Sequence, residues 1–141
     1  MSGIIGEIGA SRSGLVGFHT PKKVQYTTLL NSWVQWNTNS STSSEQGLSV
    51  QNMGKIWIVH CSMEKNIAAG QGYDIVVNLG TDFTHPVGTV ICGTSHFGYQ
   101  SHNDYTSNIE IDTSGNVTIY YNNSLDQGMQ VVGNYMGLDV S

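Results

Sequence analysis

The chain has 141 residues, of which 11% are charged and 38% are hydrophobic, and its formal net charge is −5. This length suits one folded domain with a short appendage. The five fixed cations are too few and too dispersed to form a basic stripe, so binding to nucleic acid is not expected. No stretch approaches the ~18 apolar residues that span a membrane, so membrane insertion is not expected. No secretion signal is visible at the N-terminus, so secretion through such a signal is not expected either.

The first twenty residues form a glycine-spaced apolar segment. The unit Ser-Gly-aliphatic-aliphatic-Gly stands at residues 2–6 and again at residues 13–17. Its apolar side chains have no pattern that buries them within the segment, so they need a partner surface. We therefore expect residues 1–22 to be an extended arm for docking and self-association. The side chains expected to make these contacts are Ile4, Ile5, Ile8, Leu15, Val16 and Phe18.

A head domain is expected from residue 23 to residue 141, after the break at residues 21–23. Trp33 and Trp36 are three positions apart in a strand-like run, so they point to opposite faces and at least one is expected at an interface or rim. The Ser- and Asn-rich residues 37–47 have nothing apolar to bury and predict a surface loop.

Residues 56–63 are the strongest predicted strand. Counting by twos places one set of side chains on a core face and the other set on a face that a neighbour partly covers. The core-face set is Trp57, Val59, Cys61 and Met63. The opposite set is Ile56, Ile58, His60 and Ser62.

The remainder of the chain continues in short strands. Residues 73–79 alternate, which predicts that Tyr73, Ile75, Val77 and Leu79 point inward. A further apolar run covers residues 87–93, and residues 109–112 and 117–121 form a hairpin whose turn contains Gly115. A last strand covers residues 129–135. About seven strands without helical periodicity predict an all-β fold, an antiparallel, jelly-roll-like β-sandwich.

The two cysteines, Cys61 and Cys92, each lie within an apolar run, and neither belongs to a Cys-x-x-Cys or a zinc-spaced group. Two buried reduced thiols are the favoured interpretation, because free cysteine commonly behaves as a small core residue. A disulfide between adjacent strands is the alternative.

A polar stretch at residues 94–105 carries the candidate contact residues His96, Phe97, Tyr99, His102 and Tyr105. Rigid aromatics interleaved with hydrogen-bonding groups favour recognition of a surface, such as a host glycan or protein. Packing of the same rings against a neighbouring subunit is equally compatible.

Catalysis and metal binding are less favoured for this stretch. His96, His102 and Asp104 have no spacing that dictates a shared face, and no nucleophile elbow frames the nearby serines. No phosphate loop or EF-hand loop is present in the sequence. We therefore expect no catalytic residue, no metal and no cofactor, and a function other than that of an enzyme.

The order of these features resembles the β-sandwich heads at the tips of tailed-bacteriophage fibres and receptor-binding proteins. The matching pieces are Trp33, residues 54–63, 69–79, 83–86 and 109–120, and Tyr135, within residues 24–136. The sequence departs from the pattern at Leu79-Gly80, where members of the family often carry Leu-Pro. The first seventeen residues are also similar to the starts of short virion proteins of some tailed phages.

This resemblance implies a homotrimer in the virion, assembled in the host cytoplasm, with the arms docked on other virion proteins and the heads displayed. Without heptads or long repeats between arm and head, a fibre of this kind would be short. A capsid-decorating protein with the same arm and head is one alternative. A free carbohydrate-binding module is the other, and it predicts a monomer with tyrosines and tryptophans on one sheet face.

Overall fold

The computed structural model describes residues 21–36, 47–94, 108–123 and 127–140. Within these ranges every regular element is a β-strand and every strand pair is antiparallel, which confirms the predicted all-β class. The same residues contain no helix long and apolar enough to cross a membrane. Residues 1–20 of the expected arm lie outside the described ranges.

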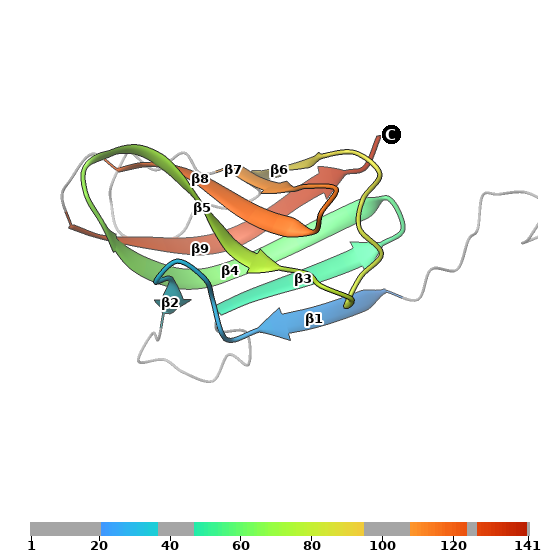
Figure 1. Ribbon diagram of the computed structural model, residues 1–141, viewed down its shortest axis with the longest axis horizontal. Helices are drawn as coiled ribbons and strands as arrows, with labels where there is room; N and C mark the ends of the chain where they lie inside the picture. Colours follow the sequence, from blue (N-terminus) through green and yellow to red (C-terminus); the bar gives the residue numbers. More distant parts are fainter. Residues whose placement is uncertain (1–20, 37–46, 95–107, 124–126, 141) are drawn as a thin grey trace, which may run out of the picture.

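Nine strands are paired in the order β1-β3-β4-β9-β6-β7-β8-β5, and β2 joins β4 beside the end of β3 (Figure 1). Their bounds are β1 Lys22–Tyr26, β2 Val34–Gln35, β3 Gly47–Met53, β4 Ile56–Ile67, β5 Gly70–Asn78, β6 Val90–Thr94, β7 Asn108–Ile111, β8 Asn116–Asn123 and β9 Gln127–Leu138. The predicted hairpin is present as β7 and β8, and Gly115 in its turn has a φ of 77°. That backbone angle favours glycine.

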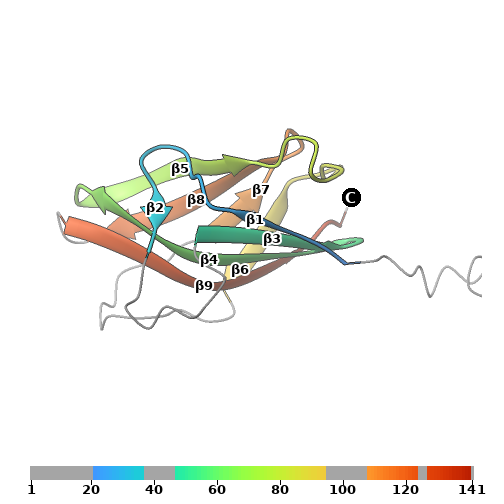
Figure 2. The ribbon, with the colours of Figure 1, turned by 90° about the horizontal axis from the view of Figure 1, so that it is seen from below.

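The sheet folds over on itself at β6. The first three residues of β6 pair with β7, whereas Gly93 and Thr94 pair with β9. Strands β1, β3, β4 and β9 therefore form one layer, and β7, β8 and β5 form a second layer that faces it (Figure 2). The result is a β-sandwich in which a single curled sheet supplies both layers.

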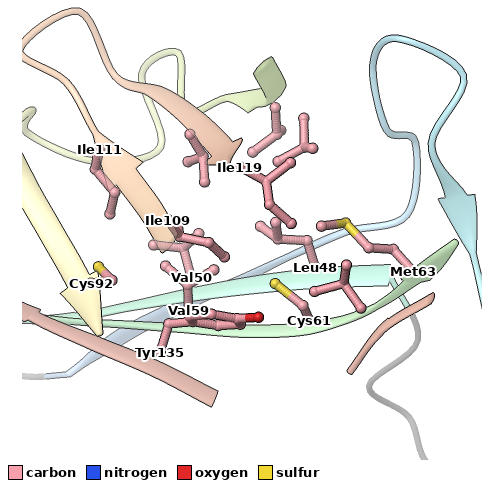
Figure 3. Packing of buried hydrophobic residues seen from close by; sticks show 14 of the residues in the cluster. Leu48, Val50, Val59, Cys61, Met63, Cys92, Ile109, Ile111, Ile119 and Tyr135 are labelled. Carbon is pink, nitrogen blue, oxygen red and sulfur yellow. The ribbon is translucent and has the colours of Figure 1, made fainter. Parts of the chain in front are cut away.

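The core lies between these two layers. The four side chains predicted for the core face of β4 are each no more than 2% exposed, which confirms the alternation read from the sequence. They meet the aliphatic side chains of β7 and β8, among them Ile109, Ile111 and Ile119 (Figure 3). Full burial of each such side chain contributes about 1.5–3 kcal/mol.

Strand β5 departs from the predicted alternation. Its pairing with β8 shifts between Ile75 and Val77, so one extra residue is inserted in the strand. Val77 and Leu79 point inward as predicted, and Val76 is also buried. The prediction is wrong for Tyr73, which is 68% exposed, and Ile75 is only partly buried. The extra residue reverses the direction in which the side chains before it point.

The segment between β1 and β2 leaves the first layer, contacts β5 of the second layer and returns to pair with β4. The Leu30 N–H donates to the Val76 carbonyl at 2.8 Å, and the buried Trp33 donates from Nε1 to Asp74 Oδ2 at 2.9 Å. Lys65 Nζ lies 2.6 Å from the same carboxylate oxygen. Trp36 is only partly buried, in agreement with the prediction that at least one of the two indoles lies at an interface or rim.

Both cysteines are buried free thiols, which confirms the favoured prediction over the disulfide (Figure 3). Burial raises the pKa of the Cys61 thiol, with a smaller contribution from the nearby Cys92. Burial also raises the pKa of the Cys92 thiol to about 12. Both groups are therefore protonated and weakly nucleophilic at neutral pH.

Candidate binding surfaces

The residues that the sequence singles out for function lie outside the described ranges. These are the arm residues Ile4, Ile5, Ile8, Leu15, Val16 and Phe18, and the contact residues His96, Phe97, Tyr99, His102 and Tyr105. Their roles remain predictions. Among the residues that are described, no group of three His, Cys, Asp or Glu side chains is placed to hold a metal ion.

The outer face of the β4–β9–β6 region carries an exposed apolar strip, formed by Ile91, Met136 and Leu138. Their side chains are 62%, 59% and 54% exposed. Met136 pairs with Ile58 and Leu138 pairs with Ile56, so two partly buried isoleucines extend the strip onto β4. Exposed apolar side chains that gather in this way mark interaction surfaces on soluble proteins.

The apolar strip lies at the end of the head where the described chain begins. Lys22 at the start of β1 pairs with Asn52, close to the β3–β4 turn, and the Asp139 N–H donates to the Lys55 carbonyl of that turn at 2.8 Å. Leu138 pairs with Ile56, the first residue after that turn, and β1 starts at the same end of the sheet (Figure 1). Strand β1 therefore starts at the end of the head that carries the apolar strip.

A second surface lies on the outer face of the other layer. Tyr73 of β5 and Tyr120 of β8 are cross-strand partners, with ring centroids 5.7 Å apart and ring planes inclined at 35°. Their side chains are 68% and 37% exposed. Two adjacent rings held by strand pairing present a rigid aromatic surface to solvent.

A carboxylate fixes one of these rings. The Tyr120 hydroxyl donates to Glu110 Oε2 at 2.8 Å. This hydrogen bond raises the pKa of Tyr120, with further contributions from burial and from the charge of Glu110. The phenol therefore stays protonated through the neutral range, and the ring is tethered to β7.

Amide side chains flank the two rings. Gln71 and Asn122 are paired across β5 and β8, and both are exposed. Together with Tyr120 and Tyr121 they line an open hollow of about 280 Å³. We call Tyr73, Tyr120, Gln71, Asn122 and Glu110 the tyrosine platform.

The tyrosine platform and the apolar strip adjoin where Glu110 pairs with Ile91, but Tyr73 lies toward the opposite end of the head from Leu138. Strand β4 runs for twelve residues from Ile56, the partner of Leu138, to the turn that precedes β5. Twelve residues of strand span ~40 Å. Tyr73 is the fourth residue of β5, close to that far turn.

Sequence reasoning missed this platform because the inserted residue in β5 cannot be read from the alternation. The available signal was that Gln71 and Tyr73 are two positions apart, as are Tyr120 and Asn122, so each pair lies on one face of its strand. The two pairs become neighbours only because β5 pairs with β8. No protein-family model matches the chain, and neither a curated protein nor a solved structure matches it.

Proposed function

We propose that this chain is a structural component of a tailed-phage virion, a short trimeric fibre or receptor-binding tip. The N-terminal arm docks on other virion proteins, and the β-sandwich head is displayed outward. The observation that carries this proposal is the apolar strip, which lies where the arm joins the head. The trimeric state and the location in a virion are inferred from the resemblance of the sequence to phage fibre heads.

Self-association through the apolar strip has a physical basis. Ile91, Met136 and Leu138 are more than half exposed in a single chain, and association would remove them from water. The glycine-spaced arm has the same need for an apolar partner, and β1, which follows it, starts at the end of the head that carries the strip. A symmetric oligomer satisfies both needs without a second kind of subunit.

The test is the mass of the full chain in solution, measured by light scattering. We expect a trimer for the unaltered chain and a lower mass when Met136 and Leu138 are both changed to Ser. A matched control is Val34→Ser, since Val34 on β2 is also exposed, at 53%, but lies away from the strip. A monomeric unaltered chain, or a trimer unaffected by the double change, would contradict association through the strip.

The arm is tested separately by changing Ile4 and Ile5 together to Ser, and then Leu15 and Val16. Each pair is expected to weaken trimerisation or incorporation into particles. Cryo-electron microscopy of a particle that carries the chain then distinguishes a tail position from a capsid-decorating one. Absence of the chain from purified particles would refute the virion assignment.

A further inference from the structure

We infer that the tyrosine platform is a binding site for a neutral oligosaccharide. The inference gives a ligand class to the display role proposed above and rests on that role for its biological setting. Its physical basis is independent, because it depends on the exposed ring pair and its polar surround on β5, β7 and β8.

The aromatic part of the site suits a sugar ring. One face of a pyranose presents C–H groups, which pack against the electron-rich face of an aromatic ring. The Tyr73 side chain is 68% exposed and leans toward Tyr120 at 5.7 Å, so the pair offers a surface wide enough for more than one sugar unit. Strand pairing holds the tyrosines in place, so little conformational entropy is lost on binding.

The polar part of the site suits hydroxyl groups. Each primary amide provides donors and an acceptor, which matches the mixed hydrogen bonding of sugar hydroxyls. Gln71 and Asn122 place two amides at the margin of the hollow beside Tyr120. The carboxylate of Glu110, already fixed by Tyr120, adds an acceptor on the β7 side.

The charge of the site disfavours acidic sugars. Glu110 is the charged member of the platform, and it would repel a sialic or uronic acid. The described cationic side chains lie elsewhere: Lys22, Lys23 and Lys55 are at the other end of the head, and Lys65 is paired with Asp74. A neutral ligand is therefore favoured.

The position of the platform suits contact with an external surface. It lies at the end of the head away from β1, where the chain enters. Tyr73 and Tyr120 lie on β5 and β8 of the second layer (Figure 2). Met136 and Leu138 of the apolar strip lie on β9 of the first layer, and Ile91 of the strip pairs with Glu110 at the margin of the platform. A head anchored by its arm and by Met136 and Leu138 leaves Tyr73 and Tyr120 open to ligand.

The test uses the full chain and nuclear magnetic resonance titration with maltotriose, cellotriose, chitotriose and lactose, and with sialyllactose as the acidic counterpart of lactose. We expect millimolar binding of at least one neutral sugar and weaker binding of sialyllactose than of lactose. Tyr73→Ala should weaken binding about tenfold, whereas Tyr73→Phe should retain it. Val34→Ala, at an exposed position outside the platform, should leave it unchanged.

Several outcomes would overturn the inference. These are no binding to any neutral sugar, equal or tighter binding of sialyllactose, and binding that survives Tyr73→Ala. A change of oligomeric state in Tyr73→Ala would assign the rings to a subunit contact instead. Light scattering on the same samples separates the two proposals: a trimer that binds no sugar refutes the sugar site alone, and a monomer that binds sugar refutes the trimer alone.

Discussion

Asp112 organises the turn of the β7–β8 hairpin. Its Oδ1 accepts the backbone N–H groups of Ser114 and Asn116 at 2.8 and 2.9 Å, and its Oδ2 accepts the Asn116 side-chain amide at 2.8 Å. Burial opposes ionisation and raises the pKa, but these hydrogen bonds outweigh it, with a smaller effect of His85, and the net pKa is lowered. The ionised carboxylate is therefore the form that stabilises the turn.

The lowered pKa of Asp112 predicts how the free energy of unfolding depends on pH. Because its pKa is lower in the folded chain than the ordinary value of 3.8, its contribution is complete above that value and is lost as the pH falls through the folded pKa. We expect Asp112→Ala to lower the free energy of unfolding at neutral pH by about 1–3 kcal/mol. The difference from the unaltered chain should shrink in acid.

Chemical denaturation at a series of pH values measures this effect. Thr113→Ala, at an exposed position in the same turn, is the control and should change stability little. A loss in Asp112→Ala that is the same in acid and at neutral pH would show that packing, not ionisation, accounts for it.

Gly137 on β9 allows β6 to approach closely where the sheet folds over. A Cβ at this position would lie 2.7 Å from the Ile91 carbonyl oxygen, 2.7 Å from Val90 Cγ1 and 2.9 Å from Cys92 Sγ. The first of these atoms is backbone and cannot rotate away. Close approach of the two strands at the place where the sheet turns thus depends on the missing side chain.

Gly137→Ala is therefore expected to destabilise the head by about 1–3 kcal/mol through overpacking. The matched control is Gly93→Ala on β6, where an added Cβ would meet nothing within 4 Å. Thermal unfolding measures the stability of the two variants. An equal loss of stability in both would show that the close contact at Gly137 does not cause the loss.

The strands differ in how far their sequence predicts them. β4 has eight consecutive positions of clear alternation, and the β7–β8 hairpin carries its own turn residues, so both were predictable. β3 was not predicted as a strand, because only Leu48 and Val50 supply its buried aliphatic side chains and its place depends on pairing with β4. The outward position of Tyr73 depends on the inserted residue in β5, which local alternation does not encode.

The whole head encloses both thiols, each with 0% exposure. Their reaction with a thiol reagent therefore requires the two layers to separate. We expect the native chain to react with dithionitrobenzoate only as fast as it unfolds, and the denatured chain to release two equivalents at once. A Val87→Cys variant, at a position that is 80% exposed, should add one fast equivalent.

Absorbance of the released thiolate gives these rates directly. Rapid reaction of either native cysteine would mean that the layers open locally, without global unfolding. In that case the thiols would report on the β4–β6 contact alone.

The placement of Tyr73 and Tyr120 on a different layer from Met136 and Leu138 has a consequence for valence. If three heads associate through Met136 and Leu138 and the two rings stay exposed, each trimer presents three equivalent weak sites. Sites held on one rigid assembly bind a repeating surface with an effective concentration far above that of free ligand. A millimolar contact would then hold firmly on a dense glycan coat and release readily from isolated sugars in solution.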